Sequence, residues 1–376
     1  MPYIDPYAKI RKQQKEAENI MDKVKYAMIG FGGIAENRIA KEGFACDTKR
    51  FTALENAVLV GTTDVNPARK MAAETLGLKW YNSSEEIFKD PEITAVFVAT
   101  NNLTHAHIAS AALKAGKHCI VEKPIAANEK DASMLCDLAS EYKLSLAVDH
   151  MMIHNAYNVK AKELIKEKTL GNVNDICLHM EFSYGSTAEE AATWRCSKVE
   201  EMGGPIGDVA SHCMYVAEFL MGSKINELCC VYYPKTMKMV VEDGAYIKFF
   251  MENGMTGSAK AAFNETRGGL GGTLSNLGYE IYGDKAALRG YGTLFQLSGY
   301  DDEPVGIRLE LDTFKGNTES VKPEKIVNIY QQVIEEHAHS VISGKAMDGR
   351  DALHNLKLVA AAHESAQNSG RKIRVN

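Results

Sequence analysis

Short apolar runs alternate with helix-like segments along the first part of the chain, from about residue 24 to residue 150. The runs predict strands at residues 25–29, 58–63, 95–99, 118–121 and 145–148. Between them, amphipathic spacing and helix start and stop signals predict helices at 67–76, 84–89, 104–115 and 129–142. Strands that alternate with helices in this way are typical of an α/β fold with a doubly wound parallel sheet.

The pattern changes after residue 149. One helix is predicted at 158–167, and the segments that follow alternate in the manner of strands. The predicted strands are 175–182, 228–233, 245–251, 257–262, 279–282, 288–290 and 307–311. Strands joined by short turns indicate a large, mostly antiparallel sheet in a second, α+β domain. Helices predicted at 326–342 and 351–368 close the chain, and we expect them to pack back on the first domain.

These patterns divide the chain into a leading segment, residues 1–23, and two domains, residues 24–149 and 150–376. The leading segment is polar and rich in Lys, Gln and Glu, and it has no apolar stretch that suits a secretory signal. It could be a polar helix at 7–23, an arm that clasps a neighbouring subunit, or a disordered tail. A glycine-rich stretch at 267–278 predicts a mobile loop.

A glycine-rich turn directly follows the first predicted strand. Residues 30–35 form a G-x-G-x-x-A pattern that leads into a helix-compatible segment. In a dinucleotide site Gly30 permits the tight turn, Gly32 lets backbone amides approach the pyrophosphate, and Ala35 allows helix and strand to pack closely. The helix N-terminus adds partial positive charge for the phosphates. The alternative is a purely structural strand-to-helix turn, which also favours glycine.

An acidic residue, Asp64, ends the second predicted strand. A carboxylate there grips the ribose hydroxyls of NAD and repels the 2′-phosphate of NADP. Asp64 lies 34 positions after Gly30, whereas the pattern expects about 20, and we interpret the excess as an insertion around residues 42–50. The alternative is a turn or capping residue, because Asn66 and Pro67 follow. We expect NAD as the cofactor, with NADP less favoured.

Composition narrows the classes of partner. The chain has 376 residues, enough for two domains with a sizeable core, and its net charge of −6 offers no global attraction to nucleic acid. No apolar run reaches the length of a membrane span. The eight cysteines contain no C-x-x-C pair. We interpret them as free thiols of a protein in the reducing cytoplasm, with no structural metal site.

A lysine follows the strand predicted at 118–121, in the tripeptide Glu122-Lys123-Pro124. The carboxyl ends of the strands face the ligand crevice of an open α/β sheet. A lysine placed there can hold positive charge where an alkoxide develops during the oxidation of an alcohol. The alternative is an exposed lysine at the end of a strand.

The stretch 201–212 joins a glycine-rich turn to a helix-like segment. Asp208 and His212 are four positions apart, so a helix places both on one face. The carboxylate would orient the imidazole and support its protonated form, as a general base that takes a carbinol proton needs. The alternative is an acidic residue that complements the helix dipole, with a core histidine four residues later.

Together these motifs resemble the Gfo/Idh/MocA oxidoreductases. The resemblance spans about residues 24–374 and rests on these motifs: the glycine turn, Thr100-Asn101-Asn102 with His105, Glu122-Lys123-Pro124, Trp194-Arg195, and Gly203-Gly204 followed by Asp208 and His212. It implies a Rossmann domain that binds NAD or NADP, and a second domain with an open-faced sheet often used for oligomerisation. It also implies a sugar or cyclitol substrate, with catalysis by Lys123, Asp208 and His212.

The resemblance and the strand-end positions predict a set of contacts. The expected cofactor contacts are Gly30, Phe31, Gly32, Gly33, Ile34, Ala35, Asp64, Asn66, Thr100, Asn101, Asn102, His105, Glu122 and Lys123. The expected substrate contacts are His150, His154, Asn155, Trp194, Arg195 and His212.

The chain departs from the family at two places. Asn101 stands where the family often has proline, and the stretch 150–155 replaces a frequent arginine–aromatic pair. Histidine and asparagine side chains there offer neutral hydrogen-bonding groups to hydroxyls, which argues against a sugar acid as substrate. Met151 and Met152 form either an apolar wall or simple core. Trp194 can stack on a pyranose face while Arg195 grips hydroxyls.

The sequence therefore predicts an NAD-dependent dehydrogenase that acts on a secondary hydroxyl of a sugar, glycoside or cyclitol, for instance C3 of a pyranoside. One alternative is an enzyme that recycles NAD while it cleaves a glycoside. Another is a non-catalytic NAD or sugar sensor, which the presence of Lys123, Asp208 and His212 opposes. The expected partners are a small carbohydrate and further copies of the chain, bound through the second sheet, with no nucleic acid and no membrane.

Overall fold

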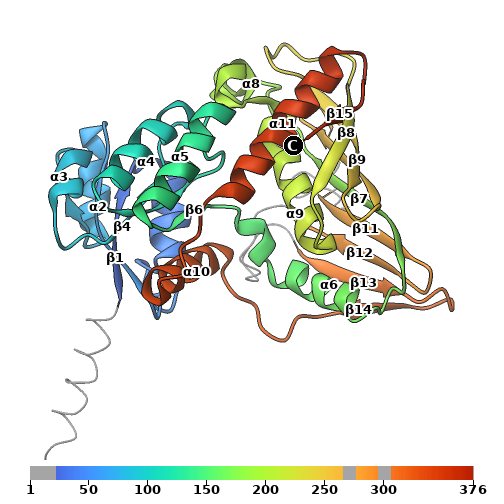
Figure 1. Ribbon diagram of the computed structural model, residues 1–376, viewed down its shortest axis with the longest axis horizontal. Helices are drawn as coiled ribbons and strands as arrows, with labels where there is room; N and C mark the ends of the chain where they lie inside the picture. Colours follow the sequence, from blue (N-terminus) through green and yellow to red (C-terminus); the bar gives the residue numbers. More distant parts are fainter. Residues whose placement is uncertain (1–22, 266–276, 295–305, 376) are drawn as a thin grey trace, which may run out of the picture.

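The computed structural model describes residues 23–265, 277–294 and 306–375. The described chain forms two lobes, one built on a six-stranded sheet and the other on a nine-stranded sheet (Figure 1). The predicted leading segment, residues 1–23, lies outside the described residues except for Lys23. The predicted loop 267–278 does so except for its last two residues, which begin a strand.

The first lobe contains the predicted parallel sheet, with strands in the order β3-β2-β1-β4-β5-β6. The strands are β1 (Val24–Ile29), β2 (Ala57–Thr63), β3 (Lys79–Trp80), β4 (Ala95–Val98), β5 (His118–Val121) and β6 (Leu146–Val148). The five predicted strands are confirmed. Strand β3 was not predicted, because two residues are too few to form a hydrophobic pattern. The order reverses between β1 and β4, where sheets of this kind open a ligand crevice.

Three of the helical segments of the first lobe, η2, α3 and α5, begin at a polar side chain that caps them. The segments are η1 (Ala35–Gly43, a π-helix), η2 (Pro67–Arg69), α2 (Lys70–Thr75), α3 (Ser84–Lys89), η3 (Asn102–Thr104), α4 (His105–Lys114) and α5 (Glu129–Tyr142). Asn128 accepts a hydrogen bond from the Asp131 amide at 3.0 Å and so starts α5. The helix predicted at 67–76 is divided into η2 and α2. The excess residues before Asp64 form the long η1 and the irregular segment after it.

The second lobe is a mixed sheet in the order β14-β13-β12-β11-β7-β10-β9-β8-β15. Its strands are β7 (Val173–Glu181), β8 (Ile225–Tyr232), β9 (Gly244–Met251), β10 (Thr256–Ala262), β11 (Leu277–Gly283), β12 (Ala287–Tyr291), β13 (Arg308–Asp312), β14 (Thr318–Val321) and β15 (Ile373–Arg374). Within the described chain, β7 and β10 pair in parallel and the other neighbours pair antiparallel. The predicted α/β fold with a second, mostly antiparallel sheet is therefore confirmed.

Helices cover one face of this second sheet. The helical segments that follow β6 along the chain are η4 (Met151–His154), α6 (Ala156–Lys166), α7 (Ala188–Ala192), α8 (Trp194–Ser197), η5 (Val199–Glu201), η6 (Ile206–Ala210), α9 (Ser211–Met221), α10 (Ile329–Ser343) and α11 (Arg350–Gln367). Figure 1 shows α6, α9 and α11 along the sheet, with α11 reaching across to α5 in the first lobe. Helix α10 lies against the first lobe, where the Tyr26 hydroxyl and a ring nitrogen of His337 are 2.6 Å apart.

Apolar side chains bury both faces of the parallel sheet. Successive residues of a strand point to opposite faces. Tyr26 and Met28 join a core that continues into the second lobe, while Ala27 and Ile29 join a separate cluster. No helix in the described ranges has the length and apolar character needed to cross a membrane. The packing fixes the carboxyl ends of β1, β4, β5 and β6 beside the second lobe, which is where the candidate site lies.

Candidate active site

The glycine turn lies at the crevice between β1 and β4. Gly30 has a φ of +91°, and a Cβ there would approach the Ala99 carbonyl oxygen to 2.4 Å. A side chain at this position is therefore excluded by both conformation and space. Gly32 differs, because a Cβ there would meet nothing within 4 Å. Ala35 is buried at the start of η1, so the turn delivers that helix tightly onto the sheet.

Asp64 is fixed at the mouth of this turn. Its Oδ2 accepts a hydrogen bond from the Phe31 amide at 2.6 Å, and its Oδ1 accepts one from the Asn66 amide at 2.8 Å. The nearby Arg69 is occupied, because its guanidinium binds the Phe31 carbonyl and the Glu36 carboxylate. Asn66 itself caps η2, since its side chain accepts from the Ala68 amide at 3.1 Å.

A cavity of about 640 Å³ opens at this turn. Its lining comes from the carboxyl ends of β1, β2 and β4 and from the start of α3, and it includes Gly30, Gly32, Asp64, Ser84, Thr100, Asn101 and Trp194. The open space beside Gly32 leaves its backbone accessible, which is what a pyrophosphate group requires. The cavity and its lining therefore fit a dinucleotide.

A second cavity, of about 450 Å³, adjoins the first and shares Ala99, Thr100, Asn101 and Trp194 with it. Lys123 reaches this cavity from the end of β5, and Asp208 and His212 reach it from η6 and α9. The Lys123 ammonium donates to Asp208 Oδ1 at 2.8 Å and to the Asp208 carbonyl at 3.0 Å. The structure thus brings the three predicted catalytic side chains together at the junction of the two lobes.

Arg195 completes this cluster. Its Nε donates to Asp208 Oδ2 at 3.1 Å, so each oxygen of the buried carboxylate is bound by a cation. Burial alone would raise the pKa of Asp208, but Lys123 and Arg195 outweigh that effect and hold the pKa below its usual range. Asp208 is therefore an anion at neutral pH.

His212 is neutral in the resting protein. Burial lowers the pKa of His212 well below its usual value, and the charges of Lys123 and His150 lower it further. The charge of Asp208 opposes this shift but does not overcome the effect of burial. The resting imidazole is neutral, so it can accept a proton but does not begin with one.

Most of the predicted contact residues lie near the two cavities. Ile34, Thr100, Asn101, Asn102, Glu122, Trp194 and Arg195 line the second one. Asn102 also donates to the Glu201 carbonyl at 2.6 Å, which ties the first lobe to the second. His105 is buried, and its ring nitrogens lie 2.8 Å from the Pro124 carbonyl and 3.3 Å from the Thr100 carbonyl. It holds the strand-end loops together and lines neither cavity.

The three polar residues predicted after β6 are placed differently. His150 is buried and stacked on Tyr215, with 3.9 Å between ring centroids, and burial lowers its pKa to about 3. His154 lies 3.4 Å from Glu336 and borders a separate cavity. Asn155 caps α6 by accepting from the Tyr157 amide at 3.0 Å. None of the three lines the catalytic cavity: His150 is buried against Tyr215, and η4 and the start of α6 direct His154 and Asn155 elsewhere.

Several residues that line the second cavity were absent from the predicted contacts. Met180, Phe182 and Tyr330 line the wall together with Met151, which the sequence left open as wall or core. Tyr330 arrives from α10, more than 200 positions after Lys123. A periodic apolar pattern places such side chains in a core, but it cannot distinguish a core from the wall of a pocket.

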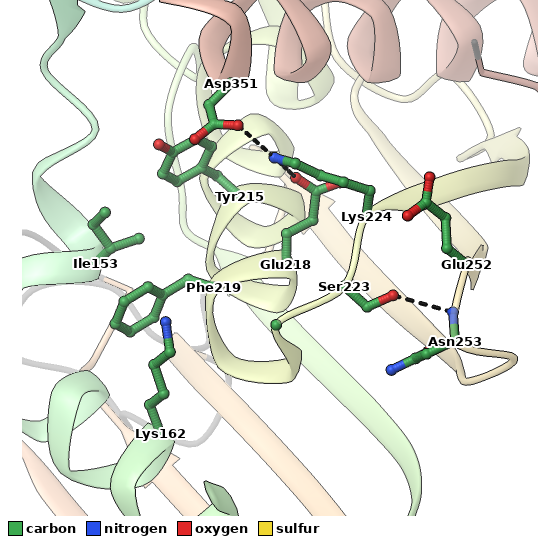
Figure 2. Close-up of a pocket in the computed structure, with 11 residues that line it drawn as sticks. Ile153, Lys162, Tyr215, Glu218, Phe219, Ser223, Lys224, Glu252, Asn253 and Asp351 are labelled. Carbon is green, nitrogen blue, oxygen red and sulfur yellow. Dashed lines mark hydrogen bonds and ion pairs between the residues drawn. The ribbon is translucent and has the colours of Figure 1, made fainter. Parts of the chain in front are cut away.

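A third cavity, of about 540 Å³, lies toward the C-terminal end of α9 (Figure 2). Figure 2 shows Lys224 between Glu218 and Asp351, each 2.9 Å from its ammonium. No predicted site residue borders this space. Tyr215, whose ring stacks on His150, borders this cavity.

Two family models match the chain. The one described as an oxidoreductase family with an NAD-binding Rossmann fold, Gfo/Idh/MocA, matches residues 24–150. The one described as the Gfo/Idh/MocA C-terminal domain matches residues 158–289. Each match falls on one of the two lobes.

Curated relatives agree with these matches. The 1,5-anhydro-D-fructose reductase of Ensifer adhaerens is 26% identical over 340 residues, which are 89% of this chain and 96% of that protein. The levoglucosan dehydrogenase of Pseudarthrobacter phenanthrenivorans is 29% identical over 174 residues, 45% of this chain and 43% of that protein.

Solved structures share the whole fold. An aldose-aldose oxidoreductase from Caulobacter crescentus, complexed with glycerol, matches with a TM-score of 0.79 at 20% identity, over 94% of this chain and 99% of that one. A levoglucosan dehydrogenase in complex with NADH and levoglucosan matches with a TM-score of 0.77 at 19% identity, over the same shares. With both family models matched in sequence order, this chain belongs to the Gfo/Idh/MocA family of oxidoreductases, and its first lobe is the NAD-binding Rossmann domain of that family.

Proposed function

We propose that this protein oxidises a secondary hydroxyl of a sugar, glycoside or cyclitol with NAD. The observation that carries the proposal is the meeting of Lys123, Asp208 and His212 in a cavity that adjoins the nucleotide cavity. Residues 24–149 then bind the cofactor, and residues 150–376 bind the substrate and form the contacts between copies of the chain.

The chemistry follows from the charges in the cluster. Bound NAD supplies a hydride acceptor for the hydrogen on the carbinol carbon. A ring nitrogen of the neutral His212 takes the hydroxyl proton. The ammonium of Lys123 stabilises the negative charge that develops on the same oxygen. Asp208 holds Lys123 and Arg195 in place and supplies the negative charge that an imidazolium at His212 needs.

The lining of the cavity suits a carbohydrate. Trp194 and Phe182 offer aromatic faces, and the Arg195 guanidinium lies 4.7 Å from the centroid of the Trp194 ring. Apolar ring faces combined with a few fixed polar groups are what a sugar needs, since it carries both C–H faces and hydroxyls. The names of the relatives, an anhydrofructose reductase and a levoglucosan dehydrogenase, support the same substrate class. Within that class we favour C3 of a pyranoside.

Asp64 supports NAD over NADP. Its carboxylate lines the nucleotide cavity, and Arg69, which binds the Phe31 carbonyl in the turn, is paired with Glu36. A 2′-phosphate would therefore meet a negative charge without a free cation to compensate it.

We make two further assignments, one for the contacts between copies of the chain and one for the cellular compartment. The face of the second sheet that the helices leave uncovered carries Val231 and Tyr246, each more than half exposed, and we assign it to contacts between copies. All eight cysteines are free, and five of them are buried. Free thiols of this kind suit a reducing compartment such as the cytoplasm.

The direct test is a panel of sugars, glycosides and cyclitols incubated with NAD or NADP while absorbance of the reduced cofactor is followed. Accumulation of NADH with a neutral sugar or glycoside supports the proposal. Release of an aglycone without net reduction of NAD would replace it with cofactor-recycling glycoside cleavage. Nucleotide binding without turnover of any member of the panel would favour a sensor.

A further inference from the structure

Two acidic side chains, Glu122 and Asp149, lie next to each other behind the catalytic lysine. Val121 and Val148 are register partners at the ends of β5 and β6, and the Asp149 amide donates to the Val121 carbonyl at 2.9 Å. The two carboxyl groups therefore leave neighbouring parallel strands at the same level. Glu122 borders the catalytic cavity, whereas Asp149 is only 1% exposed.

Asp149 has an unusual lack of partners. Among the residues that the structure describes, neither of its carboxylate oxygens has a hydrogen-bond donor. Burying an ionised carboxylate without donors carries a large free-energy cost. Two ionised carboxylates cannot hydrogen-bond each other, because both are acceptors only, but one added proton makes one of them a donor.

The groups around the pair indicate which member carries the negative charge. Burial raises the pKa of Glu122, but the charge of Lys123, the Lys123 amide that donates to Glu122 Oε2 at 3.0 Å, and the charge of Arg195 all oppose that rise and favour the Glu122 anion. Burial also raises the pKa of the Tyr330 hydroxyl on α10, and the charges of both acids raise it further. Burial raises the pKa of Asp149 well above its usual value, and the Glu122 carboxylate raises it further.

We propose that Asp149 carries a proton in the resting protein and donates it to the Glu122 carboxylate, so that the pair bears one negative charge. Asp149 is then a positioning residue. It holds the Glu122 carboxylate beside Lys123 and prevents a second negative charge from competing with Asp208 for the lysine. This consequence for Lys123 rests on the proposed function, but the proton itself does not.

The proton can be observed directly by infrared spectroscopy of the protein without cofactor or substrate. At neutral pH the wild type should show the carbonyl stretch of a protonated carboxyl group, and Asp149→Asn should lose it. Glu122→Gln should keep the band at a shifted frequency, because the acceptor changes from carboxylate to amide. Glu336→Gln is the matched control, since Glu336 also has a pKa raised by burial but lies away from the pair.

Absence of the band from the wild type would overturn the proposal, and so would its loss in Glu122→Gln with retention in Asp149→Asn. If Asp149→Asn fails to fold, carbon-13 labelling of the aspartate carboxyls in the wild type gives the same answer by NMR. One aspartate should then keep the protonated chemical shift at neutral pH. These readouts do not depend on turnover, so an inactive protein with the band would contradict the proposed function alone.

The role of Asp149 as a positioning residue has a separate readout. Asparagine keeps the donor, so Asp149→Asn should retain turnover at neutral pH within about threefold. The wild type should lose activity at alkaline pH as Asp149 deprotonates, and Asp149→Asn should not show this alkaline loss. An identical alkaline limb in both proteins would leave Asp149 with no part in positioning Lys123.

Discussion

Lys123 and Asp208 are 85 positions apart in the chain, and their side chains meet at 2.8 Å with both nearly buried. Lys123 lies just after β5 of the Rossmann sheet, and Asp208 lies in η6 of the second lobe. This ion pair therefore joins the two lobes at the point where the nucleotide cavity and the substrate cavity adjoin.

Removing the ammonium of Lys123 should abolish most of the chemistry without removing the cofactor. We expect Lys123→Ala to lower kcat by at least ~100-fold, because an electrostatic group aimed at the developing alkoxide is lost. Steady-state kinetics with NAD and a sugar that the wild type oxidises measure kcat, and calorimetry measures the affinity for NAD. Lys224→Ala is the control, since Lys224 also bridges two carboxylates but borders the third cavity. Equal losses in both variants would contradict a catalytic role for Lys123.

The neutral state of His212 predicts the pH dependence of oxidation. Because its pKa is lowered well below the usual value, which is about 6.5, the base form persists as the pH falls through that value. We expect kcat/KM to stay level there and to decline only in more acidic solution. An acid limb centred at or above the usual histidine value would contradict this. Replacement of the exposed His107 by Gln should leave the profile unchanged.

The same shift affects stability, with a defined sign. The unfolded chain binds a proton at His212 at a higher pH than the native protein does, so protonation favours unfolding. The native state should therefore lose stability as the pH falls through the unfolded-state pKa. His150 and His154, whose pKa values are lowered by burial to about 3 and about 4, add to the same loss. Thermal unfolding followed across that range should show it.

Asp64 should determine the choice of nucleotide. The Phe31 and Asn66 amides bind different oxygens of Asp64, so Asp64→Asn keeps an acceptor for one of them and removes the negative charge that a 2′-phosphate meets. We expect the preference for NAD over NADP, measured as a ratio of kcat/KM, to fall by about tenfold. Asp284→Asn, in a turn of the second sheet, serves as control. An unchanged ratio in Asp64→Asn would remove the argument for NAD specificity.

Substitutions at two glycines of the turn should have different effects, one on stability and the other on nucleotide binding. Gly30→Ala places a Cβ against the Ala99 carbonyl and forces alanine into a positive φ, so it should lower the melting temperature clearly. Gly32→Ala meets no atom of the protein, so its melting temperature should stay close to that of the wild type while NAD binds more weakly. An unchanged melting temperature in Gly30→Ala would contradict the structural role of Gly30. Normal NAD affinity in Gly32→Ala would contradict the role of Gly32 in nucleotide binding.

The sequence predicted the elements that carry local signals. Helices α3 and α5 match their predicted bounds because Ser83 and Asn128 provide visible caps. Strand β5 matches because a short apolar run is bounded by polar residues on both sides. The edge strands β14 and β15 were not predicted, since three exposed polar residues followed by Val321 in β14, and only two residues in β15, give no apolar alternation.

The site was predictable as far as motifs define it. Lys123, Asp208 and His212 follow recognisable turns, so their identity could be read from the chain. The binding of the Asp208 carboxylate by Arg195 as well as Lys123 could not be read from the chain, because it depends on how Arg195 lies relative to η6. Asn155 illustrates the opposite difficulty, since the same amide that suits a sugar hydroxyl also suits the start of a helix, and here it caps α6.

Trp194 borders both the nucleotide cavity and the substrate cavity, and the chain has one other tryptophan, Trp80 in β3. A Trp80→Phe protein would thus hold a single indole fluorophore, seated where the two ligands come closest. Its emission would report the arrival of each ligand in turn, and so would reveal the order of binding without any chemical label.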